Sequence, residues 1–242
     1  MTGGGRGIGA ATCRLAAEQG YAVCVNYLRN AGAAAAVVRE ISSAGGKAVA
    51  VGANVADELE VLKLFDTVDR ELGRLDALIN NAGILARASR LQDMDLARIQ
   101  KLYATNVFGA MLCAREAVKR MSTRNGGGGG AIVNVSTGLV KSGAPGMFVD
   151  YASSKAAIEA FTGGLARELA TEGIRVNAVR PGMIDTEIHS DGGDPDRMKK
   201  AKDVVPMKRP GEAEEVARAI LWLASDAASY TTGTVLDVSG GI

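Results

Sequence analysis

Apolar residues follow two patterns along this chain: continuous runs, and stretches in which they recur every three or four positions. Continuous runs bounded by turn residues predict strands buried on both faces, as in a parallel sheet. Six such runs are YAVCVNY (21–27), KAVAVGANV (47–55), LDALINN (75–81), AIVNVS (131–136), IRVNAVRP (174–181) and TVLDVSG (234–240). Helical periodicity predicts helices around them, at residues 8–19, 31–44, 57–72, 95–123, 151–172 and 212–224. This alternation predicts an α/β protein with a doubly wound parallel sheet flanked by helices.

The glycine-rich stretch TGGGRGIG (2–9) leads directly into the first helical pattern. A glycine cluster alone also fits an ordinary turn. Before a helix, however, the missing Cβ atoms let the backbone approach a pyrophosphate that the N-terminal amides bind. We therefore expect a Rossmann-type dinucleotide site, within one domain that spans residues 1–242 without a linker or repeat. The candidate phosphate-binding residues are Gly3, Arg6, Gly7, Ile8 and Gly9.

One element of this architecture is missing from the sequence. The glycine turn of a doubly wound sheet follows a first strand at the centre of the sheet, yet only Met1 precedes Thr2. Without that strand, its two neighbours would face a gap with unpaired backbone groups. We expect that about five to seven apolar residues, a typical strand length, are absent from the sequence.

Charge and cysteine content narrow the range of partners. The chain has 28 Lys and Arg against 27 Asp and Glu, so no overall field attracts nucleic acid or an anionic membrane surface. We expect a small-molecule partner. Cys13, Cys24 and Cys113 lack CxxC spacing and predict neither a disulfide framework nor a metal site. No run is long enough to span a membrane and no signal-peptide pattern is present, so a cytoplasmic protein is expected.

The residues at the end of the YAVCVNY run bear on the choice of cofactor. An acidic residue at this place binds the ribose 2′-hydroxyl of NAD and repels a 2′-phosphate. Here the residues are Asn26 and Tyr27, and neither is acidic. Arg6 and Arg29 can supply positive charge to a 2′-phosphate. The sequence therefore favours NADP(H), with NAD(H) as the other option.

Tyr151 and Lys155 are the strongest candidates for chemistry, because four residues make one helical turn and both side chains then share a face. A phenol has a pKa near ~10, so proton exchange at neutral pH requires a nearby cation that favours the phenolate. Moving that pKa to about 7 takes roughly 4 kcal/mol, more than one exposed charge supplies. We expect the pair to lie in a cleft with further help.

Five motifs in order give the chain its resemblance to a known family: TGGGRGIG, LDALINNAG (75–83), AIVNVSTG (131–138), the Tyr151/Lys155 pair and IRVNAVRPGMIDTEI (174–188). Together they resemble the short-chain dehydrogenase/reductase family over essentially the whole chain. The resemblance implies hydride transfer between NAD(P) and an alcohol or carbonyl, with a sugar and a 3-oxoacyl thioester as alternative substrates. It implies that Tyr151 exchanges a proton with the substrate oxygen and that Lys155 binds the ribose. It also implies a homotetramer formed through the central helices and the C-terminal strands.

The same resemblance assigns further residues. Asn106 would hold a water that links the lysine to solvent. The family serine that polarises the carbonyl falls on Thr137, although a register in which Ser136 serves is also open. Asn54 and Val55 stand where an aspartate usually meets the adenine; this is a departure from the family, although an amide carbonyl can still accept a hydrogen bond. The remaining cofactor contacts would be Asn81, Ala82, Gly83, Pro181, Gly182 and Thr186.

The segment around residues 183–210 corresponds to the substrate lid of the family. It contains His189, the single histidine, which we interpret as solvated or as a substrate contact because Tyr151 already serves as the base. A rival hypothesis is a dinucleotide-binding regulator without catalytic activity. The presence of both Tyr151 and Lys155 argues against it.

Overall fold

The structure, a computed structural model, describes residues 1–187 and 197–242 of the chain. Its six described strands are all parallel and match the six predicted apolar runs. β1 pairs with β2, and a second group has the order β3-β4-β5-β6. The strands are β1 (Val23–Tyr27), β2 (Ala48–Gly52), β3 (Ala77–Asn80), β4 (Gly130–Val135), β5 (Ile174–Pro181) and β6 (Val235–Val238).

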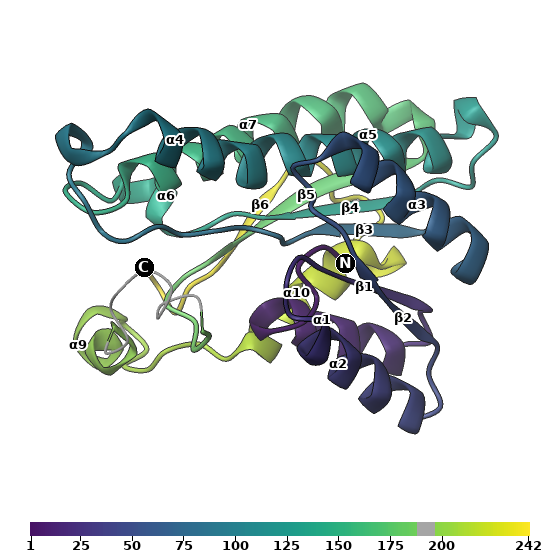
Figure 1. Ribbon diagram of the computed structural model, residues 1–242, viewed down its shortest axis with the longest axis horizontal. Coiled ribbons are helices and arrows are strands. Elements are labelled where there is room, and N and C mark those ends of the chain that lie inside the picture. The colour runs from purple at the N-terminus through teal and green to yellow at the C-terminus, as the bar shows by residue number, and fades with distance from the viewer. Residues whose placement is uncertain (188–196) are drawn as a thin grey trace.

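Helices cover both faces of this sheet (Figure 1). On one face lie α1 (Gly7–Glu18), α2 (Ala31–Ser43) and α10 (Ala213–Ala224). On the other lie α3 (Glu58–Leu72), α4 (Leu96–Tyr103), α5 (Gly109–Met121) and α7 (Val149–Leu169). Shorter pieces are α6 (Leu139–Ser142), α9 (Ala201–Val204) and the 3₁₀ turns η1 (Leu91–Asp93), η3 (Thr123–Asn125), η4 (Ala170–Glu172), η5 (Arg197–Lys200) and η6 (Asp226–Ala228). The predicted Rossmann-type α/β architecture is confirmed.

Helix α3 illustrates how local sequence and packing agree. Asp57 caps its first turn by accepting a hydrogen bond from Glu60 N–H at 3.1 Å. Four apolar residues at helical spacing, Val61, Leu64, Phe65 and Val68, are buried against the sheet and α5. Burial of each such side chain stabilises the fold by about 1.5–3 kcal/mol. None of the described helices has the length and apolar character that crossing a membrane requires.

The helix predicted over 95–123 is wrong in one respect, because it is two helices joined by a π-helical turn, η2 (Ala104–Phe108). The Asn106 side chain accepts a hydrogen bond from Ile84 N–H at 2.8 Å and donates to Ile84 O at 3.1 Å. These bonds fasten the turn to the segment after β3. Such single π turns are frequent at functional sites.

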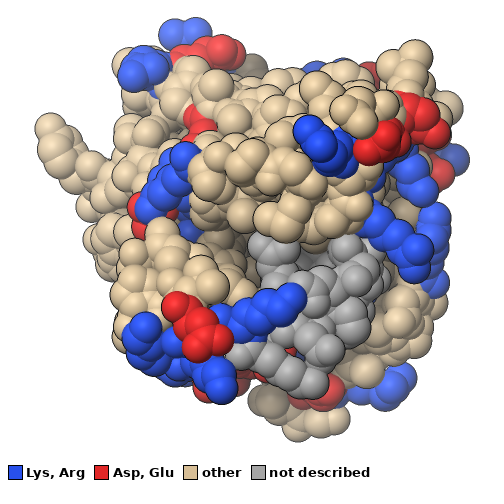
Figure 2. All heavy atoms as spheres, turned by 90° about the vertical axis from the view of Figure 1, so that its left-hand side faces the viewer, with Lys and Arg blue, Asp and Glu red and all other residues tan. Residues whose placement is uncertain are grey.

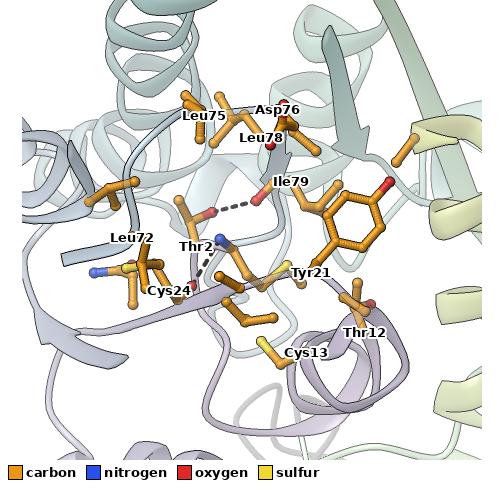
Figure 3. A pocket seen from close by; sticks show the side chains of 18 of the residues that line it. Thr2, Thr12, Cys13, Tyr21, Cys24, Leu72, Leu75, Asp76, Leu78 and Ile79 are labelled. Carbon is orange, nitrogen blue, oxygen red and sulfur yellow. Dashed lines mark hydrogen bonds between the residues drawn. The ribbon is translucent and has the colours of Figure 1, made fainter. Parts of the chain in front are cut away.

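The sheet is interrupted between β1 and β3. Met1 and Thr2 bridge the two strands there: Met1 O accepts from Asn26 N–H at 3.1 Å and Thr2 N–H donates to Ile79 O at 3.0 Å. Beyond them lies an apolar cavity of about 390 Å³ (Figure 3). It is lined by residues 21–24 at β1, residues 75–79 at β3, and side chains of α1, α3 and α10.

This cavity occupies the place of a central strand in the order β2-β1-gap-β3-β4-β5-β6. Met1 pairs with β1 and Thr2 with β3 in the manner of the last residues of such a strand. The gap predicted from the sequence is therefore found. The further expectation, that about five to seven apolar residues are absent from the sequence, stays a prediction.

Candidate active site

Tyr151 and Lys155 belong to the first two turns of α7. The Lys155 Nζ lies 5.9 Å from the centre of the Tyr151 ring and donates a 2.7 Å hydrogen bond to Val135 O at the end of β4. A Cβ atom on Gly83 would lie 3.3 Å from the same Nζ. The structure thus brings the predicted tyrosine, lysine and LDALINNAG motif together.

Lys155 is 4% exposed, and this burial lowers its pKa from the usual 10.5 to about 8. A buried ammonium retains its charge at neutral pH only with polar support, and Val135 O supplies one acceptor. Tyr151 is 8% exposed, so both side chains are buried. The expectation that the pair lies in a cleft with further help stays a prediction.

The shifted lysine predicts a pH-dependent stability. Because the folded-state pKa of about 8 lies below the unfolded value of 10.5, the unfolded chain binds the extra proton in this window. The free energy of unfolding of the wild type should therefore rise by about 3 kcal/mol relative to Lys155→Met between pH 8 and 10.5. Urea unfolding of both proteins over this range measures the change, and a difference independent of pH would contradict it.

Asn106 lies in the π turn next to this pair, with 1% exposure. Besides its two bonds to Ile84, its Nδ2 donates to Ser154 Oγ at 3.2 Å, and a Cβ atom on Gly83 would lie 3.4 Å from its Oδ1. The predicted site residue is thus in place. Both hydrogen bonds that its Nδ2 donates go to the protein, and the predicted water at Asn106 stays a prediction.

Ser136 and Thr137 differ sharply in their surroundings. The Ser136 hydroxyl is buried and donates a 2.5 Å hydrogen bond to Glu159 Oε1. Glu159 is in turn held by Arg180 through bonds of 3.0 and 2.6 Å. Thr137 is half-buried, and its Oγ1 accepts a long 3.4 Å bond from Leu139 N–H. The Ser136 hydroxyl is therefore engaged inside the protein, whereas that of Thr137 lies in the more open position.

Glu159 and Arg180 were not among the predicted site residues, although Glu159 stands four residues after Lys155 on α7. Arg180 Nη1 also bonds Asp237 Oδ1 at 3.0 Å, and Asp237 Oδ2 lies 2.9 Å from Lys141 Nζ. These ion pairs link the ends of β5 and β6 to α6 and α7. The carboxylate at helical spacing from the lysine was the signal available in the sequence.

The glycine turn fits a bound pyrophosphate. A Cβ atom on Gly9 would lie only 2.2 Å from Gly3 O, and Gly3 has a φ of +61°, so both positions require glycine. Arg6 is exposed at the N-cap of α1, and the half-buried Gly7 and Ile8 form its first turn. The amino end of α1 therefore presents free backbone amides and room for phosphate oxygens.

Thr2 and Asn81 fix this turn to the end of β3. Asn81 Nδ2 donates to Gly3 O at 3.0 Å, and Ala82 N–H donates to Thr2 Oγ1 at 3.0 Å. Thr2 was not predicted as a site residue; its place directly before the glycines was the signal. Asn81, Ala82 and Gly83 lie together along this edge, as predicted.

The segment after β5, which is predicted to contact the cofactor, also lies against the glycine turn. A Cβ atom on Gly7 would lie 3.1 Å from Thr186 Cγ2, so Thr186 contacts the turn. Pro181 ends β5, and Gly182 N–H donates to Val238 O at 3.0 Å. Thr186 therefore lies against the glycine turn, while the cofactor contacts of Pro181 and Gly182 stay predictions.

The prediction for Asn26 needs a correction. Asn26 lies inside β1 with 3% exposure; its Nδ2 donates to Val51 O and Ala53 O at 3.2 and 3.0 Å, and its Oδ1 accepts from Gly3 N–H at 3.3 Å. Alternation along the strand turns this side chain toward β2 and the glycine turn. Tyr27, half-buried, and Arg29, exposed, are the residues at this edge that can meet a ribose phosphate.

Asn54 and Val55 lie on the segment after β2. Asn54 Oδ1 accepts a hydrogen bond from Ala56 N–H at 3.1 Å, which forms a local turn. Val55 is 5% exposed and lies against Gly109 at the start of α5. The carbonyl of Asn54 retains a second lone pair for a ligand, while Val55 contributes packing.

Of the predicted lid, residues 183–187 and 197–210 are described, and His189 lies outside the described residues. Met207 N–H donates to Gly240 O at 3.2 Å, which ties the described part to the C-terminal segment. Lys and Arg side chains on this face are interspersed with Asp and Glu (Figure 2), in line with the balanced charge. Over the described ranges, the structure contains no cluster of three or more potential metal ligands.

Comparisons with known proteins agree with this geometry. A family model described as enoyl-(acyl carrier protein) reductase matches residues 3–242. The chain is 52% identical to the uncharacterised oxidoreductase YgfF of Escherichia coli, over 100% of this chain and 98% of that protein. It is 40% identical to a 3-oxoacyl-[acyl-carrier-protein] reductase of Synechocystis, over 100% of this chain and 95% of the relative.

A solved structure shows the same arrangement of elements. The crystal structure of a short-chain dehydrogenase from Burkholderia cenocepacia in complex with NADP matches with a TM-score of 0.90 and 34% identity. The match covers 99% of this chain and 95% of the other.

Proposed function

The chain belongs to the short-chain dehydrogenase/reductase family, and we propose that it uses NADP(H) to interconvert an alcohol and a carbonyl, with Tyr151 as the proton donor and acceptor. It is an oxidoreductase that acts on CH–OH groups with NAD(P). The observation that carries the finer proposal is the burial of Lys155 between Tyr151 and Val135 O. Both groups required for proton exchange are present, which argues against a silent regulator.

Each residue has a stated task in this proposal. When bound, NADP(H) would supply or accept the hydride. Tyr151 donates its phenolic proton to the carbonyl oxygen during reduction and takes it back during oxidation. Lys155 favours the phenolate by its charge and binds the ribose hydroxyls, while the Thr137 hydroxyl donates a hydrogen bond to the substrate oxygen. Asn106 fixes Ile84 and so the wall of the cleft beside Gly83.

The glycine turn and the amino end of α1 would hold the pyrophosphate, and Arg6 and Arg29 would face the 2′-phosphate of NADP(H). The absence of an acid at Tyr27 and the NADP bound to the Burkholderia relative support this choice. We further propose a homotetramer. Leu96, Phe108 and Met111, which are exposed on α4, η2 and α5, support burial of this face between subunits.

Tyr27→Asp should shift the preference from NADP(H) toward NAD(H) by on the order of tenfold or more, because its carboxylate repels a 2′-phosphate and accepts from a 2′-hydroxyl. The relevant measurement is kcat/KM for NADPH and NADH over a panel of carbonyls that includes a sugar and a 3-oxoacyl thioester. Leu28→Asp, at the exposed neighbouring position, is the matched control for added charge. A wild type that prefers NADH would contradict the cofactor assignment, and NADPH binding without turnover of any compound would revive the silent regulator.

A further inference from the structure

A buried ion pair joins α4 to the first turn of α7, directly beside Tyr151. Arg98 Nε lies 2.8 Å from Asp150 Oδ2, and Arg98 Nη2 lies 3.3 Å from Asp150 Oδ1. The Asp150 side chain is 2% exposed and that of Arg98 is 17% exposed. Such two-point contacts between a guanidinium and a carboxylate fix geometry as well as charge. Neither residue has a task in the mechanism above.

Asp150 holds the amino end of the catalytic helix. Its Oδ1 also accepts a hydrogen bond from Tyr151 N–H at 2.9 Å, and a carboxylate in the first turn is favoured by the helix dipole. A buried carboxylate without a partner is strongly unfavourable. Arg98 supplies that partner.

Arg98 also bonds the segment between β3 and η1. Its Nη1 donates to Arg87 O at 2.8 Å, in the segment between β3 and η1. Ser89 N–H of that segment donates to Met147 O at 2.9 Å, just before α7. One turn along α4 from Arg98, Leu102 belongs to the apolar cluster that surrounds Tyr151. Arg98 on α4 is therefore bonded both to the segment between β3 and η1 and to the start of α7, where Tyr151 lies.

The Arg98–Asp150 ion pair also affects the balance of charge around Tyr151. Charged residues on the elements packed against Tyr151 include Asp150 and Lys155 on α7, Arg98 and Lys101 on α4, and Arg87 and Arg90 in the segment between β3 and η1. Lys141 on α6 pairs with Asp237, and Glu159, further along α7, pairs with Arg180. An uncompensated carboxylate on the residue next to Tyr151, buried as Asp150 is, would disfavour the phenolate, against the effect of Lys155. With Arg98 bound to it, Asp150 contributes its hydrogen bond to the helix while its charge is offset.

We propose that Arg98 and Asp150 are positioning residues for Tyr151. Their ion pair holds the start of α7 against the segment between β3 and η1, and it offsets the charge of the buried carboxylate on the residue next to Tyr151. This inference rests on the proposed role of Tyr151 as proton donor and acceptor. A purely structural pair would affect stability alone. An ion pair that balances charge also affects the ionisation of Tyr151. Removing Arg98 should shift the midpoint of that ionisation in one direction, and removing Asp150 should shift it in the other.

The test is a direct titration of Tyr151 in the intact protein labelled with carbon-13 at tyrosine Cζ, followed by NMR, with the Tyr151→Phe variant assigning the resonance. Arg98→Met should raise the midpoint of ionisation by roughly half to one pH unit, and Asp150→Asn should lower it by a similar amount. The double variant should return close to the wild type. Arg98→Lys keeps the positive charge but cannot make the two-point contact of the guanidinium with the carboxylate. It should leave the midpoint near the wild-type value.

Arg70→Met is the matched control, because Arg70 forms an exposed ion pair with Glu71 on α3, with the guanidinium 2.8 Å from the carboxylate. It should leave the midpoint unchanged. If Arg98→Met does not fold, Asp150→Asn alone decides, since it keeps an acceptor for Tyr151 N–H. An unchanged midpoint, or shifts of the same sign, would overturn the inference. Because the titration needs no substrate, such a result is distinct from failure of the proposed function, which an active Tyr151→Phe enzyme would reveal.

Discussion

Tyr151→Phe should lower kcat by on the order of a hundredfold to ten-thousandfold, the range that general acid–base catalysis typically contributes. The substitution deletes the hydroxyl that exchanges the proton and keeps the ring, which packs with Leu102, Phe148 and Ala152. Affinity for NADP(H) and the midpoint of thermal unfolding should therefore stay close to the wild type. Steady-state oxidation of NADPH with the best carbonyl of the panel, together with a cofactor-binding titration, measures both effects.

Tyr103→Phe is the control for loss of a neighbouring hydroxyl. Tyr103 Oη donates to Ser153 Oγ at 2.9 Å on the exposed side of the same helices, so its removal should change kcat by less than about twofold. Lys155→Ala, in contrast, should lose both turnover and cofactor affinity, because the lysine serves the phenol and the ribose. Near-normal turnover in the Tyr151→Phe enzyme would refute the assignment of the proton donor.

Patterns local in sequence predicted the strands well. The run IRVNAVRP corresponds to β5 residue by residue, since every position of a central parallel strand is covered on both faces. The gap between β1 and β3 was also predictable, because the doubly wound order requires a strand before the glycine turn. Spacing alone placed Tyr151 and Lys155 on one face of α7.

What failed depended on contacts between distant segments. Within the π turn at Ala104–Phe108, Asn106 bonds Ile84, and no helical period encodes that partner. Asn26 was misassigned because its side chain bonds across to β2. The Arg98–Asp150 contact joins residues 52 positions apart, so no local sequence pattern indicates that they interact. Periodicity fixes which face a residue occupies, whereas polar partners across the fold decide whether it serves a ligand or the protein.

Thr137→Val should lower kcat by on the order of a hundredfold, as loss of one donor to a developing oxyanion does in other enzymes. The valine keeps the branched shape at the end of β4 and deletes only the hydroxyl. Thr137→Ser keeps the donor and should retain activity within a few-fold. Comparing kcat of the two variants on the same carbonyl isolates the hydroxyl from the methyl group.

Ser136→Ala decides between the two registers left open by the sequence. The Ser136 hydroxyl donates to Glu159, which Arg180 continues to hold in this variant. The expected cost is therefore about 1 kcal/mol in the free energy of unfolding, with turnover near the wild type. If Ser136→Ala were instead inactive while Thr137→Val remained active, the bond to Glu159 would have to break on substrate binding. The hydroxyl that polarises the carbonyl would then belong to Ser136, and the network of Glu159 and Arg180 would serve to hold it ready.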